Sequence, residues 1–307
     1  MIDPLGLSAE MEEDIKEATK DYDEAKDEIN NKIHDRFKDI ENKRHPMGDR
    51  QIWDLNKRKN ALTAGYQLIV DQIRNGAKYK IKGRDADFIR IANDVYPNGK
   101  GVPGWTRFNA NQLRGIGLDV ADFSDKKSGF AAGLYQNDET GDYALSFRGT
   151  DTESFTDNHK DMRNNDRQNA GWQSDQYDLA KKLANTVLKS RDVRLKGITM
   201  TGHSLGGGLA SAASLETGKK AITINAAGLH PNTVKEGEFS LNHFGKKLIK
   251  VYYIKGELLH QVNQEIPVIS AAMRNAVGVQ IPVATPLGVS SMLDLHSAQL
   301  KVLEDKK

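Results

Sequence analysis

Apolar residues recur at three- and four-residue spacing through the first part of the chain. Ser8 can cap a helix, and one narrow apolar stripe then runs through an otherwise charged segment. The members of this stripe are Ile15, Ala18, Tyr22, Ala25, Ile29 and Ile33. The pattern predicts helices over 8–44, 49–74 and 85–95, with a break at the Pro-Met-Gly of 46–48. Charges of both signs on the polar face favour a solvated helix over a partner-binding one.

From Tyr96 onward the pattern changes to short apolar runs separated by turns. Gly and Pro cluster over 97–104, which is typical of a loop. Strand-like runs follow at 129–135, 143–147, 197–201, 221–225 and 248–254, with helical segments at 176–190 and 209–215. Strands that alternate with helices predict an α/β fold built on a mainly parallel sheet covered on both faces. We therefore divide the chain into a short leading segment (1–7), a helical region (8–96) and an α/β domain (97–307).

Composition narrows the class of protein. A chain of 307 residues, 38% of them hydrophobic, is long enough for one large domain and a smaller appendage. The net charge of +2 indicates no nucleic-acid partner. The absence of cysteine excludes disulfides, a Cys nucleophile and thiolate metal sites, and we expect no metal and no cofactor. We also expect neither a signal peptide nor a transmembrane helix, because no suitable apolar run is present.

A candidate nucleophile lies in the sequence Gly202-His203-Ser204-Leu205-Gly206. An apolar β-type run precedes this Gly-x-Ser-x-Gly pattern and a run of small residues follows it, as expected for a strand, a sharp turn and a helix. Glycine is needed two positions on either side, since larger side chains would collide with the strand and the helix. Ser204 would then stand at a helix N-terminus, where amides and the helix dipole favour a developing anion.

A second motif, Phe147-Arg148-Gly149-Thr150, ends an upstream strand where an oxyanion loop is expected. Two donors are needed at an oxyanion hole. The amide of Leu205 is predicted to supply one, and the amide of Thr150, with or without its hydroxyl, the other. A structural turn with a structural arginine is the alternative interpretation.

Together these two motifs resemble the class 3 lipase family, over about residues 85–300. The resemblance implies an α/β-hydrolase fold with a helical N-terminal extension, hydrolysis of lipid esters, and Thr150 as an oxyanion residue. One departure concerns the Trp-x-x-Asp that the family often carries after the oxyanion loop, because here Asp161 is present without the Trp.

The remaining members of a catalytic triad are predicted in the order Ser, acid, His. Six of the eight histidines precede Ser204, neighbour it or lie before the last clear strand: His34, His45, His159, His203, His230 and His243. His260 is too close to the candidate acid, which leaves His296 as general base. Glu257 follows the strand-like run at 248–254 and a Gly turn, so we expect it to orient the imidazole. Asp294 is the alternative acid.

The N-terminal Asp3-Pro4-Leu5-Gly6-Leu7 resembles the boundary that precedes the C-terminal toxin of Rhs-repeat proteins. This resemblance implies an antibacterial effector delivered into a target bacterial cell by a type VI or similar machine. It also implies a secretion carrier and a cognate immunity protein as partners. Combined with the lipase motifs, it predicts a phospholipase toxin of the A1 or A2 type that attacks membrane phospholipids.

Two other functions stay open on the sequence alone. One is a small-ester or thioester hydrolase without a toxin role. The other is a membrane-perturbing or partner-binding protein, suggested by the apolar, Pro-containing segment 266–293. We interpret that segment as a lid or a wall for acyl chains, because a lipase must shelter them. The stripe of the helical region is expected to pack on the hydrolase or on a partner.

Overall fold

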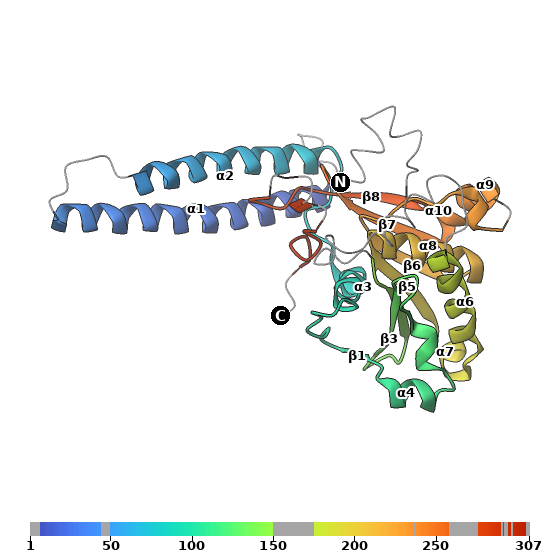
Figure 1. Ribbon diagram of the computed structural model, residues 1–307. Helices are drawn as coiled ribbons and strands as arrows, with labels where there is room; N and C mark the ends of the chain where they lie inside the picture. Colours follow the sequence, from blue (N-terminus) through green and yellow to red (C-terminus); the bar gives the residue numbers. More distant parts are fainter. Residues whose placement is uncertain are drawn as a thin grey trace.

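The computed structural model of the protein describes residues 7–43, 50–149, 175–235, 237–257, 276–289, 291, 294–295 and 297–304. Figure 1 shows two regions of different shape. Two long helices lie side by side and extend away to one side, and a twisted sheet with helices on both faces forms the rest. We call the two long helices the helical arm and the rest the body.

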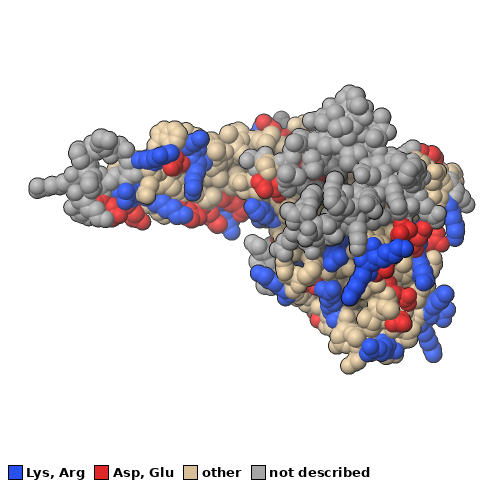
Figure 2. Space-filling view, viewed as in Figure 1, with Lys and Arg blue, Asp and Glu red and all other residues tan. Residues whose placement is uncertain are grey.

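The helical arm consists of α1 (Ala9–Lys43) and α2 (Arg50–Arg74). A helix of the length of α1 spans about 50 Å. The apolar stripe lies mainly between the two helices, where Tyr22 stacks on Tyr66 with ring centroids 4.5 Å apart. The interface between the two helices also contains polar contacts. The Lys59 ammonium of α2 donates a hydrogen bond to the Asn30 side chain of α1 over 2.8 Å. The arm is thus a pair of amphipathic helices that cover each other, and Figure 2 shows the mixed charges of its solvent-facing side.

Among the described residues, the base of the helical arm carries the contacts that tie it to the body. A small apolar cluster forms there from Ala18, Ile69, Ile73, Ala77, Tyr79 and Ala284. Around it, the Lys80 ammonium lies 2.9 Å from the Asp21 carboxylate, and the Lys82 ammonium lies 3.0 Å from that of Glu17. The backbone amide of Lys78 donates to the carbonyl of Pro282. In the described parts of the chain, the expected packing of the stripe on the hydrolase is therefore found at this end.

The body is built on a sheet in the order β1-β3-β4-β5-β6-β7-β8, with β2 paired to β3. The strands are β1 (Trp105–Arg107), β2 (Ser124–Asp125), β3 (Phe130–Asn137), β4 (Tyr143–Phe147), β5 (Ile198–His203), β6 (Lys220–Ile224), β7 (Ile249–Ile254) and β8 (Val279–Val283). Strands β4 to β8 are all parallel, and β1, β2 and β3 pair antiparallel at one side. The carboxyl ends of five adjacent strands consequently share one edge, which is where an α/β fold carries its site.

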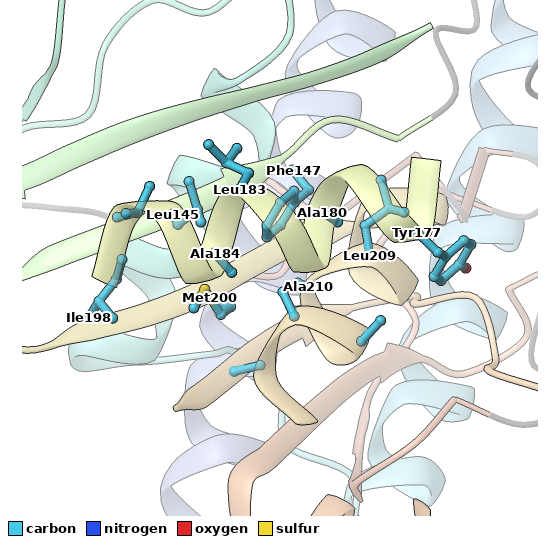
Figure 3. Packing of buried hydrophobic residues seen from close by; sticks show 14 of the residues in the cluster. Leu145, Phe147, Tyr177, Ala180, Leu183, Ala184, Ile198, Met200, Leu209 and Ala210 are labelled. Carbon is cyan, nitrogen blue, oxygen red and sulfur yellow. The ribbon is translucent and has the colours of Figure 1, made fainter. Parts of the chain in front are cut away.

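Helices cover both faces of this sheet, as predicted from the alternation of strands and helices. On one face α6 (Asp175–Lys189) packs against α8 (Leu205–Thr217) and over β4 and β5. Figure 3 shows this packing, in which Ala184 of α6 lies over Met200 of β5. On the other face lies α3 (Gly83–Asp94), and the Thr201 hydroxyl donates to the carbonyl of Phe88 over 2.9 Å.

Shorter elements connect these layers: α4 (Ala110–Gly115), η1 (Val120–Phe123), α7 (Arg191–Lys196), η3 (Pro231–Thr233), α9 (Gly237–Phe239), the π-helical turn η4 (Ser240–Phe244) and α10 (Gly245–Leu248). The predicted strands and helices are all present, shifted by a few residues. Within the described parts of the chain no helix combines the length and the hydropathy needed to cross a bilayer.

Two elements differ from their sequence-based interpretation. α3 packs on β5 and β6 rather than with the helical arm, because its buried side carries large apolar residues such as Phe88 and Ile91. The segment 266–293, interpreted as a lid or wall, contains β8 in its described part. Pro282 lowers the strand signal there, but β8 ends the described strand order, and proline is tolerated in such an edge strand.

Candidate functional site at the nucleophile elbow

Ser204 occupies the turn between β5 and α8 at the carboxyl edge of the sheet. Its backbone angles are φ 57° and ψ −129°, which L-residues rarely adopt. The Ser204 carbonyl accepts from the amide of Gly207 over 2.9 Å and from that of Ala227 over 3.0 Å. Hydrogen bonds from two different segments therefore hold this residue in a conformation that costs free energy.

The two flanking glycines are required by close backbone contacts. A Cβ atom at Gly202 would lie 2.2 Å from the carbonyl oxygen of Gly206, and one at Gly206 would lie 2.2 Å from that of Phe147. No relaxation of a flexible side chain can relieve these overlaps, because the atoms belong to the backbone. The physical reason expected for the Gly-x-Ser-x-Gly pattern is thus present in the structure.

The same contacts bring the two sequence motifs together. The amide nitrogen of Gly149 lies 2.8 Å from the Cβ position that Gly206 leaves empty, so Gly149 of the Phe-Arg-Gly-Thr motif abuts the elbow. The Gly149 amide also donates to the Tyr96 hydroxyl over 3.1 Å. The Arg148 guanidinium donates to the carbonyl of Gly129 over 3.0 Å, which is a structural contact. Thr150 itself lies outside the described residues, as does Asp161.

Leu205 is the first residue of α8 and its side chain is 1% exposed. Its backbone amide therefore belongs to the first turn of a 13-residue helix, where amides have no intrahelical acceptor. Beside this turn lies Tyr177, whose phenol a Cβ at Gly208 would approach to 2.4 Å. Complete burial raises the pKa of Tyr177 well above its usual range, so the phenol is neutral at every physiological pH.

Glu257 lies two strands from Ser204 along the same edge, after β7 and the turn at Gly256. Adjacent strands are about 4.8 Å apart, so this separation is about 10 Å at the backbone. Glu257 is only 1% exposed, and its amide donates to the carbonyl of Ile254 over 3.1 Å. Asp294, the alternative acid, is exposed. A buried carboxyl at this edge fits the role of the acid that orients a catalytic imidazole.

His296 lies outside the described residues, but the chain on both sides of it is described. Leu295 is 4% exposed and belongs to the apolar cluster between the sheet and α3. Leu295 and Gly256 also line one common groove. The residue before His296 and the residue before Glu257 thus line the same groove, although the two sequence positions are far apart.

Two residues that the sequence did not single out support this edge. Asn225 follows β6 with φ 47°, and its side-chain oxygen accepts from the amide of Ile254 over 3.0 Å. Its own amide donates to the carbonyl of Tyr252, so Asn225 joins the ends of β6 and β7. Asparagine tolerates the left-handed region better than most residues, which is the signal that was available in the sequence. Tyr96, which accepts from Gly149, carried no comparable signal.

The parallel sheet, the strained serine between β5 and α8 and the helices on both faces define an α/β-hydrolase-like fold with an N-terminal helical region. The family described as Phospholipase-like, Tle-like phospholipase domain, matches residues 88–305. The chain belongs to this family, and the match includes the second half of α3 and the whole sheet. The prediction of an ester hydrolase of the lipase or phospholipase kind is confirmed at the level of the family.

Individual proteins are also similar to this chain. The extracellular phospholipase A1 of Serratia liquefaciens is 38% identical over 156 residues, which cover 50% of this chain and 43% of that protein. This chain therefore matches less than half of its relative's length. The solved Yarrowia lipolytica LIP2 lipase is 16% identical with a TM-score of 0.41, covering 67% of this chain and 81% of the other. The Rhizomucor miehei lipase propeptide complex is 14% identical with a TM-score of 0.38, covering 76% and 69%.

Proposed function

We propose that this protein is a serine phospholipase of the A1 or A2 type that hydrolyses an acyl ester of membrane phospholipids. The observation that carries the proposal is the strained Ser204 at the elbow, locked between Gly202 and Gly206. The family match and the phospholipase A1 relative favour a phospholipid over a small ester, and the relative's name favours the sn-1 ester.

The proposed chemistry follows from the roles of the five predicted residues. The Ser204 hydroxyl attacks the ester carbonyl while His296 accepts its proton, and Glu257 stabilises the imidazolium. The amides of Leu205 and Thr150 bind the oxyanion of the tetrahedral intermediate. His296 then protonates the leaving alcohol, a lysophospholipid, and water releases the fatty acid from Ser204. The burial of Glu257 and the groove shared by Gly256 and Leu295 support the pairing of Glu257 with His296.

The test uses the full chain and vesicles of phosphatidylethanolamine and phosphatidylglycerol that carry different acyl chains at the two ester positions. Mass spectrometry of the products should find equal amounts of free fatty acid and lysophospholipid, and the acyl chain released identifies the position. Ser204→Ala should lower the rate by several orders of magnitude. Ser124→Ala, at an exposed serine of β2, is the matched control and should leave the rate unchanged. Full hydrolysis by Ser204→Ala would overturn the proposal.

We further propose that the phospholipase acts as an antibacterial effector, delivered into a target cell by a secretion carrier and neutralised in the producing cell by a cognate immunity protein. The resemblance of Asp3–Leu7 to an Rhs boundary supports this role. Expression in the periplasm of a susceptible bacterium should stop growth and release lysophospholipids. Ser204→Ala should be harmless under the same conditions. Equal killing by both forms would instead indicate direct disruption of the membrane.

A further inference from the structure

A groove of about 980 Å³ runs between the helical arm and the carboxyl edge of the sheet. One wall is the face of α2 that carries Ala61, Leu62, Ala64, Gly65, Leu68 and Ile69. The other wall is the segment after β8, Thr285, Pro286, Leu287, Gly288 and Val289, together with Gly256 and Leu295. We call this space the arm groove. Leu68 lines it and is 49% exposed, so about half of this large apolar residue is open to the groove and to solvent.

The two walls of the arm groove are held in a fixed relation. The Gln72 side chain of α2 donates to the Thr285 hydroxyl over 3.0 Å and accepts from the Thr285 amide over 2.8 Å. The Thr285 hydroxyl in turn donates to the carbonyl of Lys255 over 3.0 Å. This network joins α2, the end of β8 and the end of β7. A preformed apolar groove of this volume is typical of a small-molecule site.

The charged residues that line the arm groove restrict the kind of molecule that it can bind. Arg58 and Lys255 line the arm groove, and no carboxylate is among its described lining residues. Two cations on an otherwise apolar surface complement a molecule that is apolar over most of its length and anionic at one end. A phospholipid and its fatty acid product both have this character.

The position of the arm groove relative to the candidate catalytic residues restricts the identity of its occupant further. The lining of the arm groove includes Gly256, which precedes Glu257, and Leu295, which precedes His296. β8 is three strands from β5, so the far wall is about 14 Å from the strand that presents Ser204. A single acyl chain in a bilayer spans about 15 Å, half of the hydrocarbon core. A long acyl chain whose ester lies at Ser204 can therefore reach the groove, and a short chain cannot.

Resting on the proposed function, we propose that the arm groove binds a long acyl chain of the phospholipid substrate, which makes α2 part of the substrate site. The arm thereby sets the preference for chain length. Gly65 is central to this role. Its missing side chain opens the wall opposite Leu287, whose Cδ1 would lie 3.8 Å from a Cβ at this position.

The test compares kcat/KM for phosphatidylcholines with short and with long acyl chains. The variants are Gly65→Leu, which fills the groove, and Leu68→Asp, which adds a charge at a half-exposed position. Each buried methylene contributes about fourfold to an equilibrium, so both variants should lower the ratio of long-chain to short-chain kcat/KM by about tenfold or more. Short-chain hydrolysis should be unchanged. Gln67→Leu adds the same side chain as Gly65→Leu at an exposed position outside the groove and should keep the wild-type ratio.

The outcomes separate this proposal from the proposed function. If the wild-type protein hydrolyses no phospholipid of any chain length, the proposed phospholipase function itself is wrong. If the enzyme is active but Gly65→Leu and Leu68→Asp both keep the wild-type ratio of long-chain to short-chain kcat/KM, only the proposed acyl-chain site is wrong. Binding of a fluorescent long-chain fatty acid to Ser204→Ala gives an independent readout, and Gly65→Leu should weaken that binding about tenfold. Variants that change only the binding of a protein partner would also overturn the proposal.

Discussion

The body and the helical arm are held together by different physical means. In the body, whole side chains such as Met200, Leu209 and Ala210 are completely buried, and backbones approach so closely at Gly202 and Gly206 that no Cβ fits. In α1 no described side chain beyond Tyr22 is buried. The body therefore tolerates little change in shape, whereas the arm depends on a narrow stripe and on its base. Where the two regions meet, they enclose the arm groove.

The largest effect is expected at the elbow, where function and strain coincide. Both Ser204→Ala and Ser204→Gly should lower hydrolysis by several orders of magnitude. Glycine adopts the positive φ of this position without strain, and alanine does not. The free energy of unfolding of the Gly variant should therefore exceed that of the Ala variant by about 1 kcal/mol, which gives the Gly variant the higher melting temperature. Differential scanning calorimetry and the vesicle assay measure the two effects. An Ala variant that melts higher than the Gly variant would show that the backbone at 204 is relaxed.

Two glycine substitutions contrast the regions directly. Gly206→Ala should destabilise the body by about 3 kcal/mol or more, because its Cβ overlaps the carbonyl of Phe147. Gly65→Ala meets only ordinary contacts in α2 and should stabilise the arm by about 0.5–1 kcal/mol. Urea unfolding followed by circular dichroism gives both values. If the two substitutions had effects of the same sign, the contrast between a close-packed body and a loosely packed arm would fail.

Shortening the arm tests where it is anchored. Replacing residues 31–57 by a short Gly–Ser turn retains the Tyr22–Tyr66 stack, the base cluster and the lining of the arm groove. This protein should stay folded and active on long-chain lipid. Deletion of residues 8–75 should expose the apolar surface of Ala77, Tyr79 and Ala284 and give an unstable or insoluble product. A fully active, soluble protein without residues 8–75 would show that the base contributes nothing to the body.

The smallest effect is a pH dependence at the base of the arm. Burial raises the pKa of Asp14 above its ordinary value, against the hydrogen bond from the Tyr79 amide and the charge of Lys82. With a raised pKa the folded state binds more protons than the unfolded state, so the contribution of Asp14 to stability falls as pH rises through its pKa. Asp14→Asn does not titrate. Its melting temperature relative to wild type should therefore be higher at pH 8 than at pH 4, and a constant difference would contradict the raised pKa.

The contrast between the regions also explains what the sequence could predict. The elbow was recognisable because Gly202 and Gly206 are dictated by backbone contacts that few other sequences allow. The strands of the body were recognisable because burial on both faces imposes continuous apolar runs. The placement of α1 could not be predicted from the sequence, because an apolar stripe indicates that one face of the helix is covered but not which element covers it. β8 was hidden by Pro282, and Asn225 by a role that depends on the end of a neighbouring strand.

The central claim, that Ser204 is the nucleophile, is tested most directly by covalent labelling. The full chain is inactivated with a fluorophosphonate that carries a long alkyl group, and the modified peptide is mapped by mass spectrometry. The account predicts one adduct per chain, on Ser204, with loss of phospholipid hydrolysis in the same proportion. An adduct on another residue that tracks the loss of activity, with Ser204 unmodified, would contradict it.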